Sequence, residues 1–293
     1  MLFSHTIAER FSQYKRIRAQ YHQIFGTTPR LLFPKTFNEH LQRRKLLLRN
    51  PIYTTCSDKL QARTFICRQV GHQYLPQLLG AYEHPDQIDL DSLPAKFVLK
   101  CTHGSGWNVL CEDRAKLDWK TEADRLEEWL SLNFYQRHLE PNYLHHAPKI
   151  VAEEWLEPPI NSPGDLPDYK IFVFRGQPRL IQVDATRTSD HRRTILTPEW
   201  EVMDVDYQYL RPATTPAKPP HLDKMLDLAA RLGEPFGFVR ADFFETDRGL
   251  LVGELTFYPE AGLGRFDPPE FDELFGSFFT SPATTPSAFP EAS

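Results

Sequence analysis

The sequence FVRADFFETDRGLLVGELTFYPEAGLG, residues 238–264, contains two runs of alternating apolar side chains around a turn at 247–249. This pattern predicts a β-hairpin with a tight turn. If the two strands pair symmetrically about the middle of that turn, Asp242 lies directly opposite Glu254. Because side chains alternate between the faces of a strand, the two carboxylates share one face and an apolar core occupies the other.

Two opposed carboxylates repel each other, so this face needs a compensating cation. A hard divalent ion such as Mg²⁺, held by carboxylate and phosphate oxygens, suits the pair Asp242 and Glu254, and Thr256 follows on the same face. One alternative is that Arg240, also on this face, neutralises both acids as a surface ion-pair network. A second is an acid and base pair for glycoside hydrolysis, which nothing else in the chain supports.

Lys100 ends an apolar stretch, 97–101, that predicts a buried strand, and a loop with two glycines follows at 103–108. The backbone amides of such a loop can close around phosphate oxygens, with the lysine at the mouth of the cleft. The loop residues that we expect to contribute are His103, Gly104, Ser105 and Gly106. The spacing also fits an ordinary hairpin turn, and Lys59, by itself, fits a solvated surface lysine.

Polar and basic residues follow later strands of the chain. The strand at 150–156 brings Glu153, Glu154, Trp155 and Leu156, whose backbone groups can face an adenine edge. Lys170 stands on the next predicted hairpin, whose strands are 169–174 and 179–183. A basic run after Asp184 holds Arg187, Asp190, His191, Arg192 and Arg193. It is either a solvated loop or a clamp for an anionic substrate or transferred phosphate.

The remaining pattern predicts an α+β protein with antiparallel sheets. Helices are expected at 4–25, from Thr36 to Asn50, from Ser57 or Asp58 to Gly71, at 120–138 and at 222–232. The second of these has a capping box, with Glu39 three residues after Thr36. Strands are expected at 109–111, 236–245 and 250–257, and a disordered tail at 281–293.

The composition excludes several classes of protein. The 293 residues have a formal net charge of −5, which gives no general attraction to nucleic acid or to anionic membranes. No stretch approaches the roughly 20 apolar residues that span a bilayer. The N-terminus lacks the order of a secretion signal, and four cysteines without a CxxC pair suit a reducing compartment, so we expect a cytoplasmic protein.

Taken in order, several segments resemble the TupA-like ATP-grasp family, which is associated with teichuronopeptide and other bacterial cell-surface polysaccharides. The segments are FPKTFNEHLQRRKL (33–46), SDKLQAR (57–63), LPAKFVLKCTHGSGWN (93–108), VAEEWLE (151–157), DYKIFVFRGQP (168–178), FVRADFF (238–244) and GELTFYPEAGLG (253–264). Each segment alone is unspecific, whereas their order along the chain is specific.

The resemblance implies an ATP-grasp fold, in which two α+β lobes hold ATP between their sheets. The expected parts are a helical N-terminal region (1–92), a subdomain with the phosphate loop (93–157), a subdomain with the metal site (158–280) and the tail (281–293). The family pattern implies that Lys59 and Lys100 reach the nucleotide phosphates and that Glu153 to Leu156 contact adenine. It also implies that Arg240 binds the transferred phosphate.

By the same resemblance, Asp242 and Glu254 bind magnesium. Thr256 stands where an asparagine often serves as a further ligand in the wider superfamily, which weakens its case. With Arg240, Lys170 and Arg187 are the candidate catalytic residues.

The activity implied is that of an ATP-dependent carboxylate–amine ligase that uses ATP and Mg²⁺ and forms an amide through an acyl phosphate. Its substrates would be a small-molecule or glycan carboxylate, such as a uronic acid, and an amine, in polysaccharide biosynthesis. A kinase on the same fold and a non-catalytic nucleotide-binding protein are the alternatives. A glycosyltransferase would need a nucleotide-sugar fold of parallel strands, which the pattern does not show.

Overall fold

The computed structural model describes residues 7–159, 166–185 and 191–281. They fall into two compact units. The first unit is drawn from Met1–Leu48, Tyr169–Ala241 and Phe257–Ser293, and the second unit from Arg49–Asp168 and Asp242–Thr256. The subdomain limits predicted at 92/93 and 157/158 stay a prediction. No helix of the described residues is long and apolar enough to cross a bilayer.

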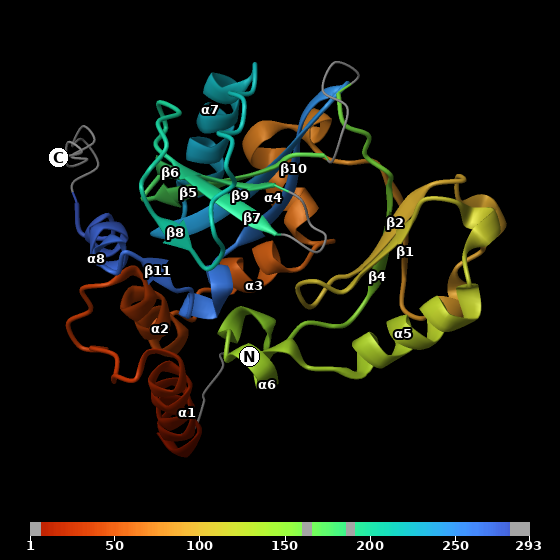
Figure 1. Cartoon of the computed structure of the whole chain (residues 1–293). Coiled ribbons are helices and arrows are strands. Elements are labelled where there is room, and N and C mark those ends of the chain that lie inside the picture. Colours follow the sequence, from red (N-terminus) through yellow and green to blue (C-terminus); the bar gives the residue numbers. More distant parts are fainter. Residues whose placement is uncertain (1–6, 160–165, 186–190, 282–293) are drawn as a thin grey trace. The chain divides into compact units, whose positions relative to one another are not determined.

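The second unit is built on an antiparallel sheet with the strand order β1-β4-β2-β3 (Figure 1). Its strands are β1 (Leu78–Tyr82), β2 (Phe97–Cys101), β3 (Asn108–Cys111) and β4 (Ile150–Glu154). Its helices are α3 (Pro51–Ser57), α4 (Ala62–Val70), α5 (Trp119–Ser131) and α6 (Phe134–His138). Short 3₁₀ turns are η1 (His72–Tyr74), η2 (Pro85–Gln87), η3 (Leu90–Ser92), η4 (Arg114–Lys116) and η5 (Pro141–Tyr143).

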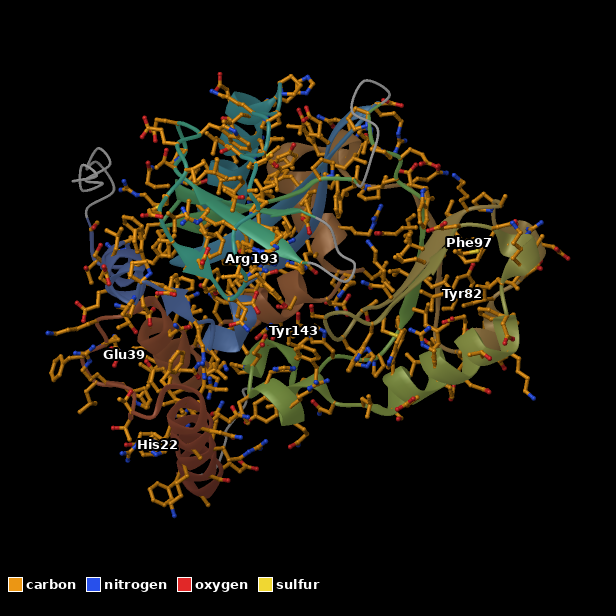
Figure 2. The ribbon with its side chains drawn as sticks, viewed as in Figure 1. His22, Glu39, Tyr82, Phe97, Tyr143 and Arg193 are labelled. Carbon is orange, nitrogen blue, oxygen red and sulfur yellow. The ribbon has the colours of Figure 1, made fainter. Side chains whose placement is uncertain are left out.

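The register of this sheet separates a core face from a polar face. Val98 pairs with Glu153 and Lys100 with Val151, so the period of two puts Lys100 and Glu153 on one face. The alternate residues of these two strands face the other way. They join an apolar cluster that includes Phe97, which Figure 2 labels, and Leu126 of α5. The alternation of the sequence therefore turns the charged side chains away from the core.

A five-stranded sheet has the order β10-β9-β5-β6-β7, and the division between the units falls within β9, after Ala241. Its strands are β5 (Asp168–Phe174), β6 (Gln177–Ala185), β7 (Arg192–Leu196), β9 (Phe238–Thr246) and β10 (Gly249–Thr256). A small sheet pairs β8 (Asp206–Tyr207) with β11 (Phe266–Asp267). The helices of the first unit are α1 (Ile7–Phe25), α2 (Phe37–Leu47), α7 (Leu222–Gly233) and α8 (Glu270–Ser277), with a 3₁₀ turn η6 (Pro259–Gly262).

Phe37, the first residue of α2, lies at the centre of the first unit's core. Six rings lie within 5.3–6.3 Å of its own: Phe172, Phe174, Phe238, Phe266, Phe275 and Phe279. Aromatic pairs at these distances add to the stability that burial of their area provides. The first residue of α2 therefore contributes to this core.

Several predicted elements are confirmed. Thr36 and Glu39 form the predicted capping box of α2. The predicted hairpin of β5 and β6 is present, but its turn is only Arg175 and Gly176, whose φ angles are +50° and +75°, and β6 starts at Gln177, two residues before the predicted 179. The last two long strands, β9 and β10, have the predicted turn between them.

Other predictions are wrong. The helix predicted to start at Ser57 or Asp58 begins later, at Ala62 (α4), because those residues instead end the unpredicted helix α3, which the Asn50 side chain caps. The predicted helix 120–138 also breaks, since Asn133 caps α6. Strands β1 and β7 were not predicted, and β4 ends at Glu154, short of the predicted 156.

Candidate active site

The second unit contains a small hollow, open to solvent, which brings four of the predicted site residues together. These are Lys59, Lys100, Glu153 and Glu254. Its wall also includes the apolar side chains of Ala62, Ile66, Leu75, Pro76, Val252 and Leu255, together with Cys56, Ser57, Arg63, Tyr143 and Gly253. A concave site with a mostly apolar wall and a few convergent charged groups is the usual form of a small-molecule site.

Glu153 lies between two cations in this cavity. Lys100 Nζ donates to Glu153 Oε2 at 2.6 Å, and Arg63 Nη1 donates to Glu153 Oε1 at 2.8 Å. Arg63 Nη2 also donates to the backbone oxygen of Pro76 at 2.6 Å. The side chains of Lys100, Arg63 and Glu153 are 20%, 16% and 8% exposed. Their charges therefore compensate one another in a site that is largely shielded from water.

Lys59 joins the glycine loop to the cavity. Its ammonium donates to the carbonyl oxygen of Gly104, and its backbone amide donates to Thr102 O at 3.3 Å. Desolvation lowers the pKa of Lys59, and the neighbouring Lys100 acts in the same direction, whereas the carboxylate of Glu254 raises it.

The loop between β2 and β3 suits a phosphate. Gly106 has a φ of +78°, which favours glycine, and a Cβ on Gly104 would lie 2.4 Å from the ring of Trp107. His103 is buried, with Nε2 3.0 Å from the carbonyl oxygen of Trp129, so it anchors the loop. No described residue accepts a hydrogen bond from the exposed backbone amides of Ser105 and Gly106. Such amides can donate hydrogen bonds to the oxygens of an anion.

The segment predicted to contact adenine lies at the end of β4. Glu153 turns its carboxylate into the cavity, as described above, whereas the Glu154 carboxylate accepts from the backbone amide of Gln77 at 2.6 Å and from the guanidinium of Arg248. Trp155 and Leu156 follow the strand and are half-buried. The structure therefore brings Glu153 to the lysines and directs Glu154 elsewhere.

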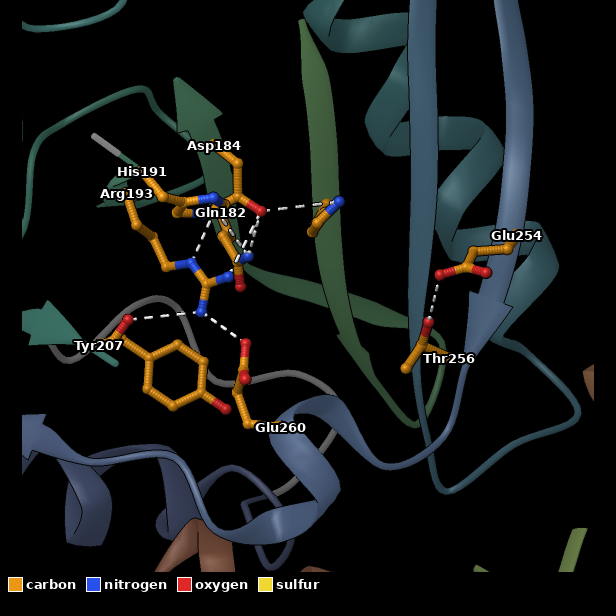
Figure 3. Close-up of polar contacts among 9 residues, drawn as sticks. Gln182, Asp184, His191, Arg193, Tyr207, Glu254, Thr256 and Glu260 are labelled. Carbon is orange, nitrogen blue, oxygen red and sulfur yellow. Dashed lines mark hydrogen bonds and ion pairs between the residues drawn. The ribbon is translucent and has the colours of Figure 1, made fainter. Parts of the chain in front are cut away.

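Two of the predicted metal ligands lie on β10 and one on β9. Thr256 Oγ1 donates to Glu254 Oε1 at 3.3 Å, so the hydroxyl supports that carboxylate (Figure 3). Asp242 is 3% exposed. No three His, Cys, Asp or Glu side chains of the described residues gather as a metal site, so a magnesium ion here would need oxygens from the nucleotide. Glu254 lines the lysine-containing cavity, and the predicted opposition of Asp242 to Glu254 stays a prediction.

The first unit has its own polar cluster around Asp184 of β6 (Figure 3). Arg193 Nε donates to Asp184 Oδ1 at 2.7 Å, Gln182 Nε2 donates to the same carboxylate at 3.0 Å, and Lys170 Nζ lies 3.7 Å away. Burial by itself would raise the pKa of Asp184, but Arg193, Lys170 and Arg240 lower it to about 2. Two predicted catalytic residues, Lys170 and Arg240, thus act on one carboxylate.

Arg193 links this cluster to an unusual turn. Its Nη1 donates to Glu260 Oε1 at 2.7 Å, and Glu260 and Ala261 have φ angles of +49° and +53°. Such angles are strained for residues with a Cβ and need support. Gln42 and Lys45 of α2 supply it, because Lys45 Nζ donates to Ala261 O at 2.7 Å and Gln42 Nε2 to the same oxygen at 3.0 Å.

The guanidinium of Arg193 already binds Asp184 and Glu260. It therefore does not fit the anion clamp that is one of the two interpretations of the basic run. Arg187, a predicted catalytic residue, lies outside the described residues. Sequence reasoning missed Arg63 and Glu260. The only available signal for Arg63 was its place four residues after Lys59, in the same short segment.

One comparison with known proteins identifies a family. A sequence profile described as TupA-like ATP-grasp matches residues 39–280. No curated protein sequence matches the chain.

Solved ATP-grasp structures resemble the chain more distantly. The ATP-grasp ligase PsnB, with a phosphomimetic variant of its minimal precursor, Mg and ADP, shares 13% identity at a TM-score of 0.44 and covers 78% of this chain and 58% of its own. D-alanine–D-alanine ligase from Bacillus anthracis with ATP shares 15% identity at a TM-score of 0.41. The match covers 69% of this chain and 55% of the ligase. N5-carboxyaminoimidazole synthase from Aspergillus clavatus with ADP shares 12% identity at a TM-score of 0.40. The match covers 70% of this chain and 45% of the synthase. The chain thus spans about half the length of these proteins, and the assignment depends on the family match.

Proposed function

Because the chain belongs to the TupA-like ATP-grasp family, we propose that it is an ATP-dependent ligase that joins a carboxylate to an amine. The observation that carries the proposal is the cavity in which Lys59, Lys100 and Glu254 converge beside a glycine loop. A triphosphate needs cations and backbone amides to bind it and an acidic metal site to hold Mg²⁺. The cavity is lined by Lys59, Lys100 and Glu254, and in this proposal the glycine loop supplies the amides and Asp242 the second acid.

The proposed reaction has two steps. A carboxylate oxygen of the substrate attacks the γ-phosphorus of ATP, the bond from this phosphorus to the β,γ-bridging oxygen breaks, and ADP leaves with that oxygen. The amine nitrogen then attacks the acyl carbon, the bond to the phosphate oxygen breaks, and the nitrogen loses a proton. The products are ADP, phosphate and an amide, and no nucleophilic side chain is required.

In this scheme the residues of the cavity position charge. Lys59 and Lys100 bind phosphate oxygens, and closure of the loop at 103–108 excludes the water that would hydrolyse the acyl phosphate. Asp242 and Glu254 would hold Mg²⁺, which would lower the repulsion between the triphosphate and the attacking carboxylate.

The family pattern also implies roles for residues outside this cavity. Arg240 would bind the transferred phosphate, and Lys170, whose ammonium is 3.7 Å from Asp184, would hold an acidic substrate. Arg187 and Thr256 keep the roles that the family pattern implies. The family association with surface polysaccharides supports a uronic acid or similar glycan carboxylate, with an amino acid or amino sugar as the amine. Because this rests on family analogy, the panel below covers all of these classes.

The test is the release of ADP from Mg-ATP, followed by chromatography, with a panel of uronic acids and amine donors given singly and in pairs. The amine donors are amino acids and amino sugars. We expect ADP only when an acid and an amine are both present, with one phosphate formed for each amide. ADP with a stable phosphorylated sugar and no amine would instead identify a kinase. Nucleotide binding without turnover on any pair, including polymer-linked acids, would favour a non-catalytic binding protein.

A further inference from the structure

We infer that Arg63 is a positioning residue of the nucleotide site, which holds the Glu153 carboxylate so that Lys100 can pass from Glu153 to a phosphate. The inference rests on the proposed function only in taking a nucleotide polyphosphate as the ligand. Arg63 belongs to the first turn of α4, and Glu153 to β4, so the two residues join a helix to the polar face of the sheet.

The contacts of Arg63 explain why it stays in place. One nitrogen binds Glu153 Oε1 at 2.8 Å and the other binds the Pro76 carbonyl at 2.6 Å. A guanidinium is a rigid planar fork, so two contacts of this kind fix both its position and its plane. Lys100, in contrast, holds Glu153 Oε2 at 2.6 Å with a compact ammonium on a flexible stem. Of the two cations, the lysine is the one able to leave.

The charges make this division of labour necessary. Glu153 is 8% exposed, and an uncompensated carboxylate in such a place is unfavourable and would repel a triphosphate. When Lys100 binds phosphate, Arg63 remains as the counter-charge of Glu153. Without Arg63, the carboxylate would retain Lys100, and the nucleotide would have to compete with it for the ammonium.

The consequence is a specific pattern of nucleotide affinity. Arg63→Met should weaken binding of Mg-ADP at least tenfold, because Glu153 then sequesters Lys100. Arg63→Lys should recover part of the loss, since it restores the charge without the fork. Adding Glu153→Gln to Arg63→Met should restore binding to within about threefold of Glu153→Gln alone, because the competing charge is gone.

The experiment titrates the full chain with Mg-ADP and a fluorescent ADP analogue, with circular dichroism of each variant to show that it is folded. Arg68→Met is the matched control, because Arg68 is an exposed residue of the same helix, and we expect wild-type affinity. Recovery in the double variant is the decisive result, since a residue that only stabilises the fold would give additive losses.

Equal affinity of Arg63→Met and the wild-type protein would overturn this inference while leaving the proposed function intact. A double variant as weak as Arg63→Met would also overturn it, because Arg63 would then bind the nucleotide or support the fold directly. A folded wild-type protein that binds no nucleotide would instead remove the proposed function, and the role of Arg63 with it.

Discussion

Asp184 shows how a single residue can control stability. Its pKa in the folded chain is about 2, below its ordinary value of 3.8, because Arg193, Lys170 and Arg240 outweigh the effect of burial. A lowered pKa stabilises the fold at pH values above the ordinary one, and this contribution is lost as the pH falls toward the folded-state value. The shift corresponds to about 2 kcal/mol.

We expect Asp184→Asn to lower the free energy of unfolding near neutral pH by about 2 kcal/mol or more, because Arg193 loses a buried partner. The difference from the wild-type protein should shrink between about pH 4 and about pH 2, where the wild-type carboxyl is also protonated. Urea titrations across this range measure it, with the exposed Asp227→Asn as control. A difference that does not change with pH would contradict the assigned cause.

At the scale of residues, the two predicted lysines line one cavity, whereas the partners of the site residues were not predicted. Lys59 and Lys100 stand in segments with a recognisable pattern, so both could be proposed before the structure was known. Arg63 and Glu153 are separated by 90 residues, and nothing local in either segment indicates their contact. The role of Arg193 was misread for the same reason, since its partner Glu260 lies 67 residues away.

The helix α2 depends on its first residues for stability. Thr36 accepts a hydrogen bond from the Glu39 amide at 3.2 Å, and Glu39 accepts from the Thr36 amide at 3.3 Å. Thr36→Ala should lower the free energy of unfolding by about 1 kcal/mol, the usual value for a lost cap. Denaturant unfolding measures the change. Thr28→Ala, at an exposed position outside any helix, should have no effect, and an equal loss there would show that the cap is not the cause.

Elements with a strong local pattern were predicted, and those shaped by distant partners were not. The capping box and the Arg175-Gly176 turn depend on residues that are close together in the sequence. Strand β1 contains Leu-Leu-Gly-Ala-Tyr, a sequence without clear alternation, and becomes a strand by pairing with β4. The basic start of β7 resembles a solvated loop, but pairing with β6 and the ion pair with Asp184 make it a strand.

At the scale of the whole molecule, ligand binding should increase the free energy of unfolding. A ligand at about 100 times its dissociation constant stabilises a fold by about 2.7 kcal/mol, so Mg-ATP should raise the melting temperature clearly. Asp242→Asn and Glu254→Gln should melt like the wild-type chain without ligand but lose the increment that Mg²⁺ adds to ATP, and their turnover should be abolished. Thermal melts with ATP, with and without Mg²⁺, measure this. Full turnover in either variant would mean that the metal site lies elsewhere.

The cavity wall comes from two separated stretches, one within 56–153 and one at 252–255. During translation, both lysines and Glu153 leave the ribosome long before Glu254. At about 5–20 residues per second the nascent chain waits on the order of 5–20 seconds for that acid. Until then the nascent pocket contains both lysines and Glu153 but not Glu254. The site is therefore completed late in synthesis, and a chain cut short before residue 254 would keep the two lysines but lack Glu254 and Thr256 of its proposed metal ligands.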